Sequence, residues 1–108
     1  MRYKVDTIAP FRKEAKKLIK KYPSLINDLA ELGRQLSIDP TSGTSLGNSC
    51  YKIRLAITSK GKGKSGGARI ITHFYIAADT VFLLYIYDKS NRVNIPDSQI
   101  KELLLLIK

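Results

Sequence analysis

Three cations in the middle of the chain are placed to act together on a phosphate group. Lys52 and Arg54 alternate with apolar residues in one segment, and Arg69 begins the next apolar segment. Side chains two residues apart project from the same face of a strand, so Lys52 and Arg54 share a face. If Arg69 lies on that face of a neighbouring strand, the three cations converge. Lys89 and Arg92 follow the last apolar strand segment, and we expect them to close the cleft in which these three cations meet.

The segment that joins these two strands is rich in glycine and lysine. Residues 60–69 contain four cations, four glycines and no acid. Glycine removes side-chain bulk and lets backbone N–H groups approach an extended polyanion closely. A merely solvated basic surface is the alternative, but six cations without one acid between Lys52 and Arg69 favour a nucleic-acid contact. The residues predicted to bind RNA are Lys60, Lys62, Lys64, His73 and Arg92.

Metal-free cleavage of RNA is a reaction that such a cluster of cations would support. The 2′-hydroxyl of the substrate is the nucleophile, so the protein must supply a proton acceptor, a proton donor and positive charge around the phosphorane. Crowding by Arg54 favours the neutral, proton-accepting form of Lys52. Arg69 is suited to hold the phosphate oxygens with two hydrogen bonds. The donor to the leaving 5′-oxygen is Lys64, Lys89 or His73, and the sequence leaves that choice open.

Nucleotide-binding and metal-dependent interpretations have less support. Gly61, Gly63 and Gly66 match a dinucleotide-binding spacing, but that site needs a helix directly after the glycines, and a strand is expected here. His73 is the single histidine, and the aspartates of the C-terminal half are widely spaced, so we predict no metal site and no cofactor. Cys50 could act as a nucleophile only with His73 as its base, which is the weaker interpretation.

Length and charge limit the possible partners. The chain has 108 residues, which suits a single domain over 1–108. Its net charge of +10 indicates a polyanionic partner, and an apolar fraction of 44% indicates a folded chain. No segment approaches the ~18 apolar residues of a membrane span, and the N-terminus lacks an apolar signal region. We therefore predict a cytoplasmic protein that does not interact with membranes.

The apolar patterning predicts an α+β fold in the order β-α-α-β-β-β-α. Strands are expected at 2–8, 51–57, 69–77 and 80–87, helices from Pro10 to Tyr22, from Leu25 to a point before Pro40, and from near Pro96 to the C-terminus, and a loop at 41–49. An N-terminal helical hairpin thus packs on one face of a mostly antiparallel four-stranded sheet, and we place the C-terminal helix on that face as well. Ala78 and Asp79 are expected to form the tight connection of an antiparallel hairpin.

Three segments resemble the RelE/HigB-type toxins of bacterial toxin–antitoxin pairs, within the RelE/ParE superfamily. They are Tyr51-Lys52-Ile53-Arg54-Leu55, Gly63-Lys64-Ser65-Gly66-Gly67-Ala68-Arg69-Ile70-Ile71 and Leu83-Leu84-Tyr85-Ile86-Tyr87-Asp88-Lys89-Ser90. The resemblance implies a ribosome-dependent, metal-independent endoribonuclease that enters the ribosomal A site and cuts mRNA. It also implies a cognate antitoxin protein, which covers the toxin and lets the complex bind operator DNA.

The resemblance further implies catalytic roles for four cations. Lys52 and Arg54 match the catalytic basic pair of the family. Arg69 matches the arginine that contacts the scissile phosphate, and Lys89 falls near a further basic position after the last strand. Segment 91–97 departs from the family, because it lacks the tyrosine that some members carry at the start of the last helix and holds Arg92 where HigB-like relatives have an acidic stretch.

Two other functions fit parts of the sequence. A ParE-like inhibitor of DNA gyrase would share the fold, but its hallmark would be the loss of the strand cations, and Lys52, Arg54 and Arg69 are all present. A non-catalytic basic nucleic-acid-binding protein is consistent with the net charge alone.

Overall fold

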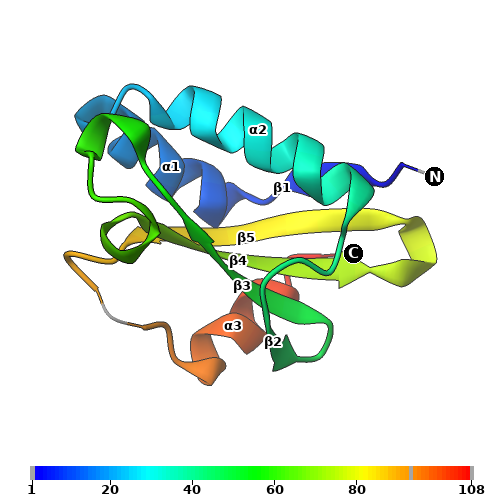
Figure 1. Cartoon of the computed structure of the whole chain (residues 1–108). Helices are drawn as coiled ribbons and strands as arrows, with labels where there is room; N and C mark the ends of the chain where they lie inside the picture. The colour runs from blue at the N-terminus through cyan, green and yellow to red at the C-terminus, as the bar shows by residue number, and fades with distance from the viewer. Residues whose placement is uncertain (1, 93, 108) are drawn as a thin grey trace.

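The structure, a computed structural model, describes residues 2–92 and 94–107 as one sheet with helices on both of its faces (Figure 1). The elements follow the order β-α-α-β-β-β-β-α, which confirms the predicted α+β class and adds one strand. Their bounds are β1 Lys4–Thr7, α1 Ala9–Lys21, α2 Leu25–Ile38, β2 Thr44–Gly47, β3 Cys50–Leu55, β4 Ala68–Tyr75, β5 Thr80–Asp88 and α3 Asp97–Leu104.

The sheet is mixed and mostly antiparallel, with the strand order β1-β5-β4-β3-β2. β1 runs parallel to β5, whereas the pairs β5–β4, β4–β3 and β3–β2 are antiparallel. The predicted hairpin of β4 and β5 is confirmed. Its turn ends at Asp79, whose φ of 49° is a left-handed conformation that aspartate tolerates better than most residues.

The predicted loop at 41–49 is wrong in part, because it contains the fifth strand, β2. Thr44–Gly47 is exposed along its whole length, so it shows no apolar alternation from which a strand could be predicted. A two-residue turn sets its pairing with β3: Asn48 and Ser49 have φ values of 54° and 57°. Positive φ at both central residues is typical of the tight type I′ turn, which matches the twist of paired strands. The sheet therefore has five strands rather than four.

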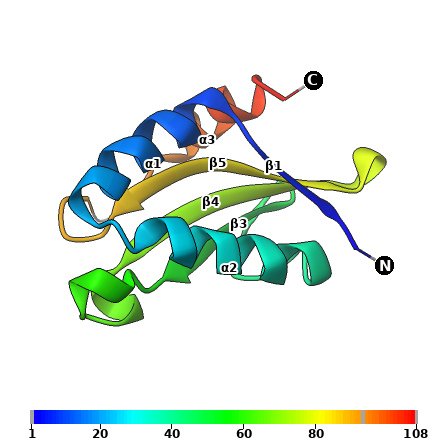
Figure 2. The same ribbon diagram turned by 90° about the horizontal axis from the view of Figure 1, so that it is seen from above.

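The C-terminal helix α3 lies on the face of the sheet opposite to α1 and α2, so the placement of all helices on one face is wrong (Figures 1 and 2). Strand β5 explains the difference. Leu83 packs in the cluster under α1 and α2, while its neighbour Leu84 packs with Ile100 and Leu103 of α3. A strand that is apolar on both faces needs cover on both faces.

Helix α3 is also shorter than predicted. It ends at Leu104, and the side chains of Leu105 and Leu106 are 79% and 53% exposed. The predicted helical end at Lys108 lies outside the described residues.

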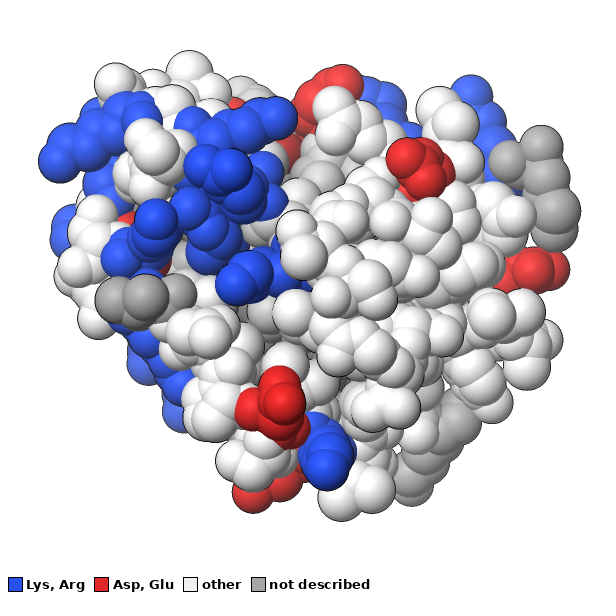
Figure 3. Space-filling model, turned by 60° about the horizontal axis from the view of Figure 1, so that its bottom comes forward, with Lys and Arg blue, Asp and Glu red and all other residues white. Residues whose placement is uncertain are grey.

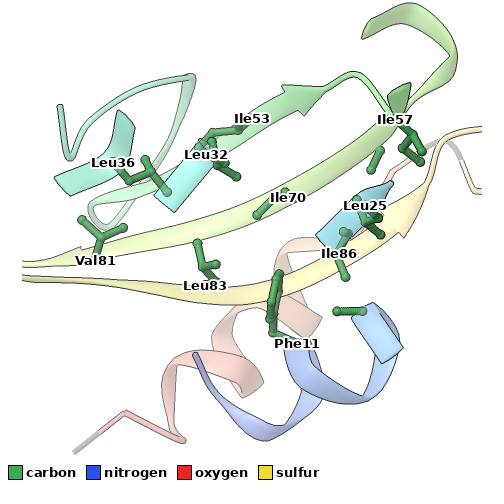
Figure 4. Close-up of a cluster of buried hydrophobic side chains, with 12 residues drawn as sticks. Phe11, Leu25, Leu32, Leu36, Ile53, Ile57, Ile70, Val81, Leu83 and Ile86 are labelled. Atoms are coloured by element: carbon green, nitrogen blue, oxygen red, sulfur yellow. The ribbon is translucent and has the colours of Figure 1, made fainter. Parts of the chain in front are cut away.

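The larger core lies between the sheet and the N-terminal helical hairpin (Figure 4). Leu25 and Leu36 of α2 are fully buried and belong to the same cluster as Phe11 of α1. On the sheet side they meet Ile70 of β4 and Ile86 of β5. This packing makes the central strands a rigid support for the polar side chains on the other face.

Candidate functional site

A pocket of about 370 Å³ opens where β3 ends, β4 begins and β5 ends. The residues that line this basic pocket are Thr44, Lys52, Arg54, Arg69, Lys89 and Asn94. The structure thus brings the four cations predicted to be catalytic into one cavity. Among the described residues, no acidic side chain lines the basic pocket. It can therefore accept an anion without repulsion from a carboxylate.

The strand register places the two arginines side by side. Arg54 of β3 pairs with Arg69 of β4, and Arg69 pairs in turn with Tyr87 of β5. Directly opposed residues point to the same face, with Cβ atoms about 4.5–5.5 Å apart. That face is the α3 face, because Cys50 packs in the α3 cluster and Lys52 and Arg54 follow it at even spacing.

Arg69 is the buried member of the set, with only 5% of its surface exposed. Its Nη1 donates hydrogen bonds to the carbonyl oxygens of Lys64 (2.8 Å) and Ala68 (3.1 Å). Burial lowers the pKa of Arg69, the charge of Arg54 lowers it further, and Tyr87 partly offsets both effects. A guanidinium still remains protonated at neutral pH. The structure therefore holds a fixed positive charge at the wall of the basic pocket.

The glycine–lysine loop, residues 60–67, is held at both ends. At its start, Thr58 donates from its backbone N–H and its hydroxyl to the two oxygens of Asp28, at 3.0 and 2.6 Å. At its end, the backbone N–H of Lys89 donates to the carbonyl of Gly67 at 3.1 Å. These bonds fix the loop between α2 and the segment after β5, and the carbonyls of Lys64 and Gly67 contact Arg69 and Lys89 of the basic pocket.

Lys60 makes a buried ion pair at the start of this loop. Its Nζ lies 2.7 Å from Oδ1 of Asp88 and 2.6 Å from Oγ of Ser90, and the Lys60 and Asp88 side chains are 9% and 2% exposed. Burial alone would raise the pKa of Asp88, but the hydrogen bonds from Lys60, Ser90 and Tyr22, with the charge of Lys60, hold it below its ordinary value. Lys60 thus has a structural partner that competes with its predicted contact to RNA.

The other two lysines of the loop are exposed. Lys62 lies in the middle of the loop, and Lys64 lines a second pocket that adjoins the basic pocket. Both side chains are open to solvent, so their predicted RNA contacts stay a prediction that the geometry permits.

His73 lies away from the basic pocket. It is on β4 opposite Cys50, and it lines a separate cavity with Leu104 and Ile107 of the C-terminal segment. Burial lowers the pKa of His73, and backbone contacts at residues 48 and 49 partly offset that effect. Its Nδ1 is 3.6 Å from Sγ of Cys50, and burial raises the pKa of that thiol to about 11. Cys50 is therefore a protonated thiol at neutral pH, a poor nucleophile.

Arg92 does not join the basic pocket either. Its guanidinium lies 5.6 Å from the ring centre of Tyr85, and it donates to the Tyr85 hydroxyl, to the carbonyl of Asn94 and to Gln99 of α3. It lines a groove on the α1 side of the sheet edge. The expectation that Arg92 closes the same cleft as Lys89 is therefore wrong, because Tyr85 and Gln99 hold its side chain elsewhere.

Sequence reasoning missed three residues near the site. Thr44 belongs to the strand that was expected to be a loop, and only its register opposite Lys52 brings it to the pocket. Asn94 lines the pocket from the segment before α3. Tyr87 is 5% exposed and its hydroxyl has no hydrogen-bond partner among the described residues. The alternation of residues along β5 indicates which face of the strand Tyr87 takes. The β-bulge after Ile71 shifts the pairing of β4 with β5, so the sequence does not reveal that Tyr87 lies opposite Arg69.

The charge distribution matches this geometry. Lysine and arginine side chains gather most densely at the upper left of the face shown in Figure 3, and the centre of that face is largely uncharged. Within residues 2–92 and 94–107, no group of three or more His, Cys, Asp or Glu side chains is arranged to hold a metal ion. Each helix in the described part of the chain is too short or too polar to traverse a lipid bilayer.

The chain matches a known protein family in sequence and resembles solved structures in fold. Residues 7–108 match the family described as the RelE toxin of the RelE/RelB toxin–antitoxin system. The matched range includes the whole of the glycine–lysine loop and every residue that lines the basic pocket.

Two solved structures of Escherichia coli RelE share this architecture. A mutant of that toxin in the free state aligns over 100% of both chains, with a TM-score of 0.65 and 19% identity. The isolated E. coli RelE toxin aligns over 97% of this chain and 99% of the other, with a TM-score of 0.52 and 19% identity. At this level of identity the alignments establish a common fold.

Proposed function

Because the chain belongs to the family of RelE toxins of RelE/RelB toxin–antitoxin systems, we propose that it is a ribosome-dependent, metal-independent endoribonuclease that cleaves mRNA. The observation that carries the proposal is the basic pocket, where Lys52, Arg54, Arg69 and Lys89 line one cavity. Four cations around one cavity suit the phosphate of an RNA strand, whose charge rises as the phosphorane forms.

The proposed reaction uses the RNA as its own nucleophile. The 2′-oxygen attacks the adjacent phosphorus as its proton passes to Nζ of Lys52, and the bond from phosphorus to the 5′-oxygen breaks. Arg54 and Arg69 stabilise the extra negative charge on the phosphate oxygens. The products are a 2′,3′-cyclic phosphate and a 5′-hydroxyl.

Lys89 is the best placed donor to the leaving 5′-oxygen. Of the three candidates, it lines the basic pocket, whereas Lys64 lines the adjoining pocket and His73 lines a distant cavity. The proton that Lys89 gives to the leaving oxygen balances the proton that Lys52 receives.

We assign a role to the ribosome because the basic pocket alone does not align the RNA strand for cleavage. Arg54 is exposed, and Lys52 and Lys89 are half-buried, so the basic pocket by itself does not fix the ribose on either side of the phosphate. In-line attack requires the 2′-oxygen, phosphorus and 5′-oxygen to be held near linearity, and a bound ribosome supplies that order to mRNA.

The partners of the proposed activity follow from the system. A toxin of the RelE/RelB system has a cognate antitoxin. We propose that mRNA and the ribosome are the other partners, that operator DNA is bound only through the antitoxin complex, and that the protein acts in the cytoplasm.

Substitution of Arg54 tests the proposal. Arg54 is exposed, so Arg54→Ala is expected to keep the fold while mRNA cleavage on translating ribosomes falls by about 10²–10³. Arg2→Ala is the matched control, because it removes an exposed arginine next to β1, which lies at the other edge of the sheet from β2 and β3. Unchanged cleavage by the Arg54 variant would contradict the proposal. Inhibition of gyrase supercoiling by the wild-type protein, with mRNA left intact, would favour a ParE-like function instead.

A further inference from the structure

A second cavity adjoins the basic pocket and shares three of its residues. This α2 pocket, of about 510 Å³, lies between α2 and the free edge of β3. Thr44, Lys52 and Arg54 line both cavities. A phosphate in the basic pocket therefore has a neighbouring space, past the edge of β3, that is large enough for a nucleobase.

The two walls of the α2 pocket have opposite chemical character. Lys52, Arg54 and Lys64 supply cations on the side of the sheet and loop. Glu31 and Gln35, one helical turn apart on α2, supply acceptor oxygens on the other side. A phosphate is attracted to the first wall and repelled by the second, whereas the amino group of a base suits the second.

Glu31 and Gln35 are the acceptors of this wall that a ligand can reach. Asp28 also lines the pocket, but its carboxylate already accepts hydrogen bonds from Thr58 and Ser24. Glu31 pairs with Arg34 on the surface, and both side chains are more than half exposed. An exposed pair of this kind is weak, so the carboxylate is available to a ligand.

The free edge of β3 adds a backbone donor and acceptor. The ladder between β2 and β3 ends at the pair Thr44 and Lys52. A Cβ added to Gly43 would come within 2.6 Å of the Lys52 carbonyl oxygen, so that carbonyl faces away from β4. Backbone groups alternate sides along a strand, so the N–H and C=O of Arg54 also point to this edge, beyond the last paired residue.

We propose that the α2 pocket holds the base of a nucleotide next to the scissile phosphate, and that Glu31 selects bases carrying an amino group. This inference rests on the function proposed above. A carboxylate accepts the amino N–H of cytosine, adenine or guanine, but it faces a carbonyl oxygen in uracil. Gln35 and the Arg54 backbone complete the contacts, and Leu32 and Leu55 form the apolar surface against the ring.

Two dinucleotides of equal charge test this inference on the whole protein. The probes are CpC and UpU with 2′-O-methyl groups, which cannot be cleaved because the nucleophile is blocked. Backbone and side-chain amide resonances are followed by NMR during titration. We expect CpC to bind about three- to tenfold more tightly than UpU, the effect of one hydrogen bond, and to shift the resonances of Arg54 N–H and the Gln35 amide.

A matched pair of variants completes the experiment. Glu31→Ala is expected to bring the CpC to UpU affinity ratio to about one. Glu102→Ala, which removes an exposed glutamate of α3, is expected to preserve the ratio. Equal affinities in the wild-type protein, no binding of either probe, or shifts confined to the basic pocket would overturn the inference, even if mRNA is cleaved on ribosomes. A cytosine preference at Arg54 and Gln35 without any mRNA cleavage would support this base site and contradict the proposed function.

Discussion

Arg54 and Arg69 stand directly opposite each other on the antiparallel β3–β4 ladder, with both side chains on the α3 face. Like charges at directly opposed positions destabilise a sheet. Arg69 is nearly buried, so water screens its charge less than it would at the surface. An anion bound between the two guanidinium groups would remove this repulsion and gain hydrogen bonds from both.

The first prediction concerns that repulsion. Phosphate at millimolar concentration is expected to raise the melting temperature more than chloride at equal ionic strength, because it binds the folded state selectively. Arg54→Ala is expected to lose the difference between the two salts. Thermal denaturation followed by circular dichroism measures the melting temperature in each salt. Equal effects of phosphate and chloride on the wild-type protein would mean that the arginine pair binds no anion.

The second prediction separates the shape of Arg69 from its charge. Arg69→Lys keeps a cation but loses the planar group that bonds the Lys64 carbonyl and, in the proposed mechanism, a phosphate as well. We expect mRNA cleavage on ribosomes to fall by about 10²–10³. Arg12→Lys, on the exposed surface of α1, is the control and is expected to retain activity. Full activity of the Arg69 variant would remove Arg69 from the mechanism.

The third prediction concerns the buried ion pair of Lys60 and Asp88. Lys60→Met leaves the Asp88 carboxylate buried without its main partner, so we expect the free energy of unfolding to fall by about 3–5 kcal/mol. Lys17→Met breaks an exposed pair with Glu14 and is expected to cost less than about 1 kcal/mol. Urea denaturation of both variants provides the comparison. Similar losses in the two variants would show that the buried pair has no special role in stability.

The fourth prediction is a loss of stability in acid that depends on Asp88. The pKa of this carboxyl is held below its ordinary value of 3.8, so the folded state disfavours the protonated form. The stabilisation is fully present above pH 3.8 and is lost as pH falls through the lowered pKa of the folded state. Asp88→Asn is expected to flatten this part of the curve of unfolding free energy against pH. A variant with the wild-type slope would assign the acid transition to other groups.

The fifth prediction uses two glycines with opposite surroundings. A Cβ on Gly67 would overlap the carbonyl oxygen of Leu55, so Gly67→Ala is expected to destabilise the protein and shift the loop beside Arg69. Gly33 lies inside α2 with no atom within 4 Å of such a Cβ. Gly33→Ala is therefore expected to stabilise the protein by about 0.5–1 kcal/mol. Melting temperatures that move in the same direction in both variants would contradict this assignment.

The positions and types of most elements could be predicted from the sequence, because their signals are local. Leucines such as Leu25 and Leu36 mark a helix by their spacing, and Lys52 and Arg54 share a face because strand side chains alternate. The same local rules identified Lys52 and Arg54 as two cations on one face, and both line the basic pocket. Strand β2 escaped prediction because it is exposed and owes its structure to pairing with β3.

Other features depend on contacts between residues far apart in the chain, and only the tertiary structure decided these features. The sequence by itself determined which side chains are cationic and which face of its own strand each one takes. Whether Lys60 meets Asp88, whether Tyr85 and Gln99 hold Arg92 away, and which face α3 covers were set by packing across the sheet. Alternation along one strand carries no information on the register of the next, and a single bulge after Ile71 changes which residues of β5 meet β4.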